Sequence, residues 1–133
     1  MAQYPDWSYF PRRTAAPNWV SEFIGVINKS KSEIESYLHH GLDSDEVLAA
    51  VRPELVNIGW QIEMGKKDSD KIFRPVLFGD AGVSKVNYEI DGWHPEHRVV
   101  LEIESGRGWQ GNAFFRDLIR TSLIQGADYL AIG

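Results

Sequence analysis

The stretch VVLEIESGRGWQG, residues 99–111, sets two glutamates one residue apart inside an apolar run. The apolar members, all good strand formers, are Val99, Val100, Leu101 and Ile103. Side chains two positions apart share one face of a strand, so Glu102 and Glu104 point the same way. Two adjacent carboxylates repel each other and stay ionised only with water or a cation nearby. The stretch therefore indicates a strand that carries either a solvated outer face or an acidic site.

The composition is typical of a single soluble domain. The chain has 133 residues, of which 43% are hydrophobic and 25% charged. It has no cysteine, which excludes disulfides and a cysteine-based zinc site. No apolar run reaches the roughly 20 residues of a membrane span, and the N-terminus lacks a signal-peptide core. We therefore expect a cytoplasmic protein with no membrane partner.

The N-terminal part predicts an irregular arm followed by helices. Residues 1–17 contain three prolines and predict the arm. Asn18 is placed to cap the first helix. A second helical piece over 32–38 would have a capping box made by Ser30 and Glu33.

A further helix is predicted from Asp43 onward. Asp43 and Glu46 have the spacing of a capping box, with aspartate as the cap. Gly59 is the expected C-terminal stop. Pro53 should kink this helix or split it in two.

The rest of the chain predicts strands around one more helix. The expected strands are 60–65, 71–79, 83–92, 99–104 and 127–133, with a helix over 112–125. Strand 83–92 should pair with 99–104 as an antiparallel hairpin, and the last strand–helix–strand unit should be a parallel crossover. The expected fold is α/β, a mixed sheet flanked by helices in one domain at 18–133. Because the chain stops in the last strand, we expect a minimal or truncated core.

Three acidic residues form the candidate site. Asp91 ends one predicted strand, and the loop length allows it to approach Glu102 and Glu104 on the next. Carboxylate oxygens suit Mg²⁺, for which Mn²⁺ can substitute, and a cation would relieve their repulsion. The net charge of −5 argues against a protein that coats nucleic acid, but not against an enzyme whose acidic site is neutralised by metal.

The pattern Asp91-x10-Glu102-Ile103-Glu104, in a strand–loop–strand before a helix and a further strand, resembles the PD-(D/E)XK restriction-endonuclease-like superfamily. The resemblance covers residues 43–133 and implies an α-β-β-β-α-β core. It implies that Asp91 and Glu102 bind the metal, with the backbone carbonyl of Ile103 as a further ligand. It also implies an active site at the sheet end that faces DNA.

The sequence departs from the family pattern at the motif lysine, where it has Glu104. Some members of the superfamily use glutamate there, so Glu104 would bind or position a second metal or the attacking water. The superfamily often adds an acid from its first helix. Glu46 and Glu54 are the candidates, with a slight preference for Glu46, although Glu46 also fits the capping box.

Basic and polar residues near the next helix are candidates for DNA contact. Arg116 and Arg120 share a helix face, and Arg107 precedes them in the glycine-rich turn. Asn112 lies at the helix N-terminus, where backbone N–H groups favour an anion, although an N-cap role explains it equally. A solvated helix face is the alternative for the two helical arginines. Cutting both DNA strands would require two sites, and so a homodimer.

Two further pairs of residues have simpler explanations. His94 and His97 lie in the hairpin loop, where solvation is the more common role than metal binding. Trp93 and Trp109 stand at the two ends of the site, and packing explains them better than stacking on bases.

Three functions are compatible with these residues. The first is a divalent-metal-dependent DNA endonuclease that hydrolyses phosphodiester bonds. The second is a non-catalytic restriction-endonuclease-like module for DNA binding or assembly, favoured by the absent lysine and the acidic charge. The third, a two-carboxylate glycosidase, would ordinarily need a longer chain for its sugar cleft.

Overall fold

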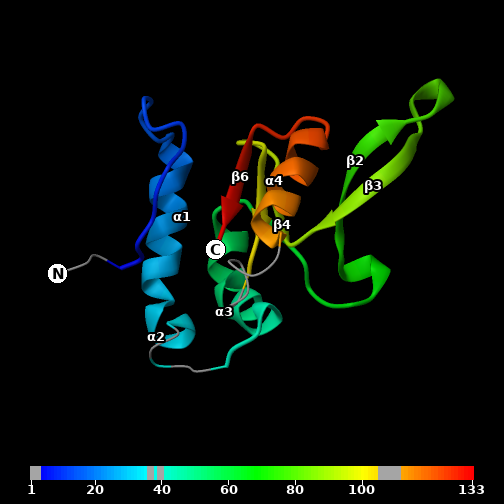
Figure 1. The fold of residues 1–133 in the computed structure, drawn as a ribbon. Helices are drawn as coiled ribbons and strands as arrows, with labels where there is room; N and C mark the ends of the chain where they lie inside the picture. Colours follow the sequence, from blue (N-terminus) through cyan, green and yellow to red (C-terminus); the bar gives the residue numbers. More distant parts are fainter. Residues whose placement is uncertain (1–3, 36–37, 39–40, 105–111) are drawn as a thin grey trace.

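The computed structural model describes residues 4–35, 38, 41–104 and 112–133 (Figure 1). Its α-helices are α1 (Asn18–Lys29), α2 (Lys31–Ile34), α3 (Ser44–Asn57) and α4 (Ala113–Leu123). Its strands are β1 (Gln61–Ile62), β2 (Ile72–Phe78), β3 (Ser84–Ile90), β4 (Gly92–His94), β5 (Val99–Glu102) and β6 (Tyr129–Ile132). Two short 3₁₀ turns, Asp68–Asp70 and Asp80–Gly82, flank β2.

The main sheet is mixed and has the strand order β1-β4-β5-β6. β4 is antiparallel to both β1 and β5, and β5 is parallel to β6. The connection from β5 to β6 runs through α4, which confirms the predicted parallel crossover. The general prediction of an α/β fold with a mixed sheet and flanking helices is therefore confirmed.

Both faces of β5 pack against other parts of the domain, and this burial determines the environment of its glutamates. Leu101 and Ile103 belong to the larger core, which also contains residues of α1 and α3. Val100 points to the opposite face and packs with Ile124, just after α4. A solvated outer face for this strand is therefore wrong, because Val100 is fully buried and Glu102 is only partly exposed.

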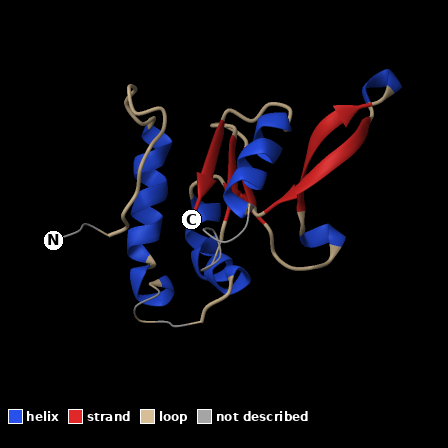
Figure 2. Cartoon of the chain, viewed as in Figure 1, coloured by secondary structure: helices blue, strands red, loops and turns tan. Residues whose placement is uncertain are grey.

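The predicted strand over 83–92 is wrong as a single strand. β3 ends at Ile90, β4 begins at Gly92, and Asp91 lies between them. β3 pairs with β2 in a separate two-stranded ribbon that projects from the domain (Figure 2), whereas β4 forms the hairpin with β5. The chain therefore leaves the β2–β3 ribbon and enters the main sheet at Asp91. The alternation of apolar and polar residues in the sequence does not reveal this change of pairing strand.

The helix ends partly confirm the predicted caps. The capping box of α3 is present, since Asp43 Oδ1 accepts from Glu46 N and Glu46 Oε2 accepts from Asp43 N, each at 2.8 Å. Gly59 follows this helix with a φ of 99°, as expected of a C-terminal stop. The predicted split at Pro53 is wrong, because α3 runs through Pro53 as one helix.

The predicted cap at Asn18 is wrong, because Pro17 is the N-cap residue of α1 and Asn18 is already helical. Ser30 is the N-cap residue of α2, but it makes no side-chain capping bond to a described residue, so the predicted capping box is wrong. Helix α2 is a single turn. Local spacing alone did not distinguish a capping residue from the first residue of the helix.

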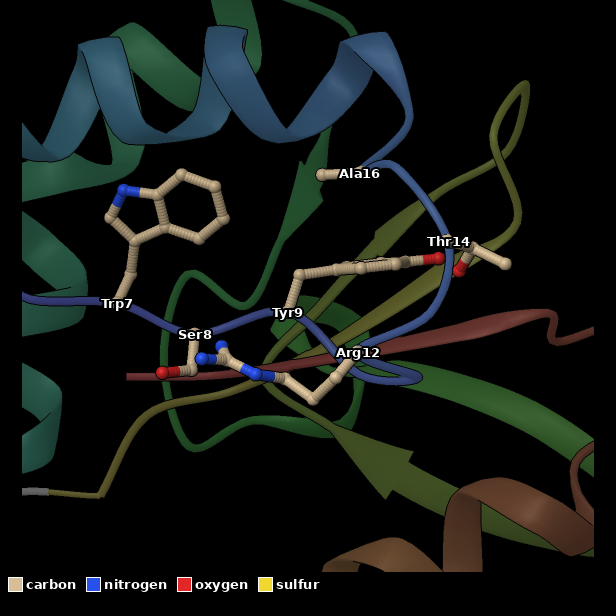
Figure 3. A pocket seen from close by; sticks show the side chains of 6 residues that line it. All are labelled: Trp7, Ser8, Tyr9, Arg12, Thr14 and Ala16. Atoms are coloured by element: carbon tan, nitrogen blue, oxygen red, sulfur yellow. The ribbon is translucent and has the colours of Figure 1, made fainter.

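The N-terminal arm lies against the domain without regular structure. Tyr9 and Ala16 pack on the larger core. Figure 3 shows the ring of Tyr9 reaching toward Thr14 and Arg12 folding back toward Ser8, around a hollow of about 240 Å³. The core also includes four buried residues of α1, Trp19, Val20, Phe23 and Val26, so it extends beyond the predicted 43–133. Within the described ranges, no helix has the length and apolarity to cross a membrane.

Candidate acidic site at the sheet end

Three carboxylates stand in a row across three neighbouring strands. The β1–β4 register pairs Ile62 with Gly92, and the backbone N–H of Glu63 donates to Asp91 O at 2.9 Å, so Glu63 opposes Asp91. The β4–β5 register pairs Gly92 with Leu101, so the next residues, Asp91 and Glu102, oppose each other. Glu63, Asp91 and Glu102 therefore meet at one end of the sheet.

Asp91 is held in place by the strand that carries the glutamates. Its Oδ2 accepts a hydrogen bond from the backbone N–H of Ile103 at 2.8 Å. Burial raises the pKa of Asp91, and the Ile103 hydrogen bond opposes this by favouring the charged form. The backbone of Ile103, whose carbonyl the resemblance assigns to the metal, thus lies beside the Asp91 carboxylate.

Glu102 is the most perturbed group of the row. Burial, followed by the charges of Asp91 and Asp117, raises its pKa to about 9. A protonated Glu102 donates a hydrogen bond to Asp91, so the two groups form an acid–carboxylate pair. Without a cation, the fold pairs these groups through a proton at neutral pH.

Glu63 is a member of the row that the sequence analysis missed. It is only 5% exposed, and its Oε1 has no hydrogen-bond partner among the described residues. Burial and then the charge of Asp91 raise its pKa. Its signal in the sequence was a lone glutamate next to Ile62 in a predicted strand, but only the pairing register brings it beside Asp91.

Asp117 of α4 extends the acidic group beneath the sheet. It is 1% exposed; Arg116 Nε donates to its Oδ1 at 3.0 Å, while its Oδ2 has no described N–H or O–H partner. Glu104 accepts from Arg116 Nη2 at 3.1 Å. Burial and a hydrogen bond to Asp117 raise the pKa of Glu104. Sequence spacing does not single out Asp117, because an acidic residue beside two arginines on a helix resembles a solvent-facing one.

The predicted DNA-binding residues differ in their surroundings in the structure. Arg116 is bound to Glu104 and Asp117. Arg120 donates from Nη2 to Glu89 O at 3.0 Å, and its guanidinium lies 4.8 Å from the ring centre of Tyr88. Asn112 occupies the exposed N-cap position of α4 without a side-chain capping bond to a described residue. Arg107 and Trp109 lie outside the described residues.

The helix acid nearest to the row is a neighbour of the predicted one. Glu46 is exposed and uses its carboxylate in the capping box of α3. The preceding residue, Asp45, contributes to the raised pKa of both Glu63 and Asp91. Lys66 bridges to Asp45 at 2.9 Å, and its charge lowers the pKa of Glu63.

The histidine and tryptophan of the hairpin have structural roles. His94 is buried, with Nε2–H donating to Ile58 O at 3.0 Å and Nδ1 accepting from His97 N at 3.2 Å. Both ring nitrogens are therefore used, which leaves none for a metal. Trp93 is buried under the guanidinium of Arg74, 4.2 Å from the ring centre, so the preference for packing is confirmed.

The donor chemistry of the row fits a hard cation in part. Across the described ranges, no group of three or more His, Asp or Glu is arranged to hold a metal ion. Mg²⁺ is usually held by one or two carboxylates, with water and substrate phosphate filling the other positions. Asp91 and Glu102 supply such a pair, and Oε1 of Glu63, which has no partner in the part of the chain that the structure describes, is a buried acceptor beside it.

Comparisons with known proteins add no relative. No protein-family model matches the chain, and searches of curated proteins and of solved structures return no match.

Proposed function

We propose that the chain is a divalent-metal-dependent DNA endonuclease of the restriction-endonuclease-like type. The observation that carries this proposal is the row Glu63–Asp91–Glu102 at one end of a mixed sheet. The element order α3-β1-β4-β5-α4-β6, with the β2–β3 ribbon inserted, supports the proposed α-β-β-β-α-β core.

In this proposal Asp91 and Glu102 hold Mg²⁺ or Mn²⁺, with the carbonyl of Ile103 as a further ligand. A bound cation would polarise the phosphodiester, lower the pKa of an attacking water and stabilise the leaving oxygen. Glu63 adds negative charge beside the pair. Glu104, on the same strand face as Glu102, positions the attacking water, and Arg116 positions Glu104 through their ion pair.

A non-catalytic DNA-binding or assembly module is the second candidate. The observation that favours it is Glu104, which stands at the place of the motif lysine and is bound to Arg116. In such a module the acidic row would still bind a cation, but no phosphodiester would be cut.

Calorimetry with Mn²⁺, with and without duplex DNA, tests the site first. We expect binding by the wild type, binding weakened by more than ~100-fold in Glu102→Gln, and unchanged binding in Glu22→Gln, an exposed glutamate of α1. Absence of Mn²⁺ binding with DNA present would refute the metal site.

Cleavage of supercoiled plasmid with Mg²⁺ or Mn²⁺ then separates the two candidates. The endonuclease predicts nicked or linear product that is lost in Asp91→Asn and kept in Glu22→Gln. Metal binding without any cleavage of duplex, single-stranded or branched DNA would favour the module.

A further inference from the structure

Arg74 of β2 is a partly buried arginine that no described carboxylate neutralises. Its guanidinium covers the ring of Trp93, 4.2 Å from the ring centre. Its Nε is buried and has no hydrogen-bond partner among the described residues. Burial lowers the pKa of Arg74, and no described carboxylate forms an ion pair with it. A cation shielded from water in this way is costly unless an anion accompanies it.

The outer end of this guanidinium remains available to a ligand. Nη1 and Nη2 of Arg74 have no hydrogen-bond partner among the described residues, and unlike Nε they are not buried. Stacking on Trp93 holds the planar group in one orientation. A ligand that binds there does not have to order a free side chain first. The fixed fork of donors matches the oxygens of a carboxylate or a phosphate.

A second guanidinium lies beside the same part of the ribbon. Arg74 and Tyr88 oppose each other across β2 and β3, so their side chains share one face of the ribbon. Arg120 of α4 lies over the ring of Tyr88, 4.8 Å from the ring centre. Its Nη2 donates to Glu89 O, and it forms no ion pair with a described residue. One cation from β2 and one from α4 therefore lie beside Tyr88.

Two neighbouring arginines favour phosphate over carboxylate as the ligand. A carboxylate has two oxygens, and one guanidinium can occupy both of them. A phosphate group has at least one further oxygen and carries a charge of about −1.5 to −2 as a monoester at pH 7, so it can accept from both arginines at once. The arginines also oppose the negative field of the acidic row, because the charge of Arg120 lowers the pKa of Glu102.

We propose that Arg74 and Arg120 form an anion site for a phosphate group at the junction of the ribbon and α4. Arg74 donates from its terminal nitrogens, and Arg120 donates from the N–H groups that Glu89 O does not occupy. The phosphate belongs either to a free phosphate compound or to a nucleic-acid backbone, which present the same kind of oxygen. Phosphate binding here needs no metal, so the inference does not rest on the proposed nuclease activity.

Spectra of the arginine Nε–H groups test the site in the full chain. The protein is labelled with ¹⁵N, kept in EDTA and titrated with inorganic phosphate. The Nε–H of Arg74 is buried, so it should exchange slowly with water and give an observable signal. This signal should shift saturably, with a dissociation constant of ~1–10 mM. Sodium chloride at equal ionic strength should leave it unchanged.

Variants separate phosphate binding from the structural cover of Trp93. Arg74→Leu keeps an apolar side chain over the ring and should weaken phosphate binding at least ~10-fold, followed on the Arg120 signal. Arg74→Lys should restore only part of the affinity, because an ammonium group is a point charge. Arg13→Leu is the matched control, since it removes an exposed arginine of the N-terminal arm. If circular dichroism shows that Arg74→Leu is unfolded, Arg120→Gln replaces it, followed on the Arg74 signal.

Short duplex DNA in EDTA distinguishes the two sources of phosphate. A shift of the Arg74 signal by DNA that inorganic phosphate reverses assigns the site to a nucleic-acid backbone. A shift by phosphate alone assigns it to a free phosphate compound. An Arg74 signal that phosphate leaves unchanged overturns the proposal, as does an equal shift of the Arg13 signal, which would mean adventitious binding of the ion. Phosphate binding by a chain that cuts no DNA would support this site and count only against the nuclease.

Discussion

Glu102 shows how a single residue links the acidic site to the stability of the fold. Its carboxyl group is largely shielded from water and lies next to Asp91 and Asp117. Burial of a charge without a partner is costly, so the group keeps a proton when no cation is present. The same arrangement would favour a cation, because the cation replaces the proton as the balancing positive charge.

The stability of the protein should therefore fall as pH rises. The pKa of Glu102 is 4.5 in an unfolded chain and about 9 in the fold, so the folded state binds more protons between these values. Its contribution is fully present below about pH 4.5 and is lost as pH rises through about 9. The slope for one such group reaches at most ~1.4 kcal/mol per pH unit. Glu102→Gln, which mimics the protonated form, should flatten this slope.

Urea denaturation at pH 5, 7 and 9 in the presence of EDTA measures this effect. The pKa values of Glu63, Asp91 and Glu104 are raised as well, so only the difference between wild type and Glu102→Gln isolates one group. Glu22→Gln should keep the wild-type slope. Equal slopes for wild type and Glu102→Gln would contradict the proton on Glu102.

Glu63 provides a second prediction at this scale. Among the described residues its buried Oε1 has no hydrogen-bond donor, and the charge of Asp91 raises its pKa. Glu63→Gln removes a negative charge beside the proposed metal ligands, so we expect Mn²⁺ affinity to fall ~10–100-fold by calorimetry. Unchanged affinity would place Glu63 outside the metal site.

At the scale of helices and strands, the features predicted correctly from the sequence are those that depend on residues close together in the chain. The capping box at Asp43 and Glu46 and the strand around Val99 depend on neighbours in the chain, and both were found. The change of partner at Asp91 depends on which strands pair, and the approach of Glu63 to Asp91 depends on their register. Neither is encoded in residue spacing.

The side of helix α4 that faces the sheet is another feature that the local sequence pattern does not predict. The spacing of its apolar residues predicted the helix correctly, but not which side faces the sheet. Asp117 is buried on the side that faces the acidic site, where its charge raises the pKa of Glu102 and Arg116 pairs with it. Periodicity locates an apolar stripe, whereas tertiary packing decides which side of the helix faces the sheet.

Gly92 of strand β4 allows the close packing at the centre of the sheet to be tested. A Cβ at Gly92 would lie 2.8 Å from Ile62 Cδ1 and 3.2 Å from Leu101 Cβ, so Gly92→Ala requires the Ile62 side chain to move and Leu101 to give way by a few tenths of an ångström. We expect a loss of ~1–3 kcal/mol in the free energy of unfolding, measured by urea denaturation. Gly25→Ala in α1 is the matched control, since its Cβ would meet nothing within 4 Å. This control should be neutral or more stable by ~0.5–1 kcal/mol; a neutral Gly92→Ala would contradict the packing.

Glu46 allows the capping and metal-binding roles to be separated. Its carboxylate accepts from Asp43 N, so Glu46→Ala should lower stability by ~0.5–1 kcal/mol through the cap. Because that side chain is engaged in the cap, Mn²⁺ affinity measured by calorimetry should stay within about twofold of wild type. Loss of Mn²⁺ affinity at unchanged stability would instead support the helix acid that the family resemblance implies.

At the scale of the whole molecule, the acidic row lies where the separate parts meet. Glu63 follows β1, Asp91 precedes β4 and Glu102 ends β5, whereas Asp117 belongs to the helix that crosses between β5 and β6. The like charges of these groups oppose the assembly of the elements when they are ionised. A cation bound at the row should therefore stabilise the entire domain.

Thermal unfolding with Mn²⁺ tests this coupling. At 100 times its dissociation constant, a ligand of the folded state adds about 2.7 kcal/mol, or roughly 8–12 °C for a domain of this size. At one fixed Mn²⁺ concentration, the shift should be larger at pH 8 than at pH 5.5, because the raised pKa values of Glu102 and Asp91 mean that Mn²⁺ must displace protons. Asp91→Asn should lose the shift, whereas Glu22→Gln should keep it. A shift that is independent of pH, or that persists in Asp91→Asn, would mean that the cation binds elsewhere than at the row.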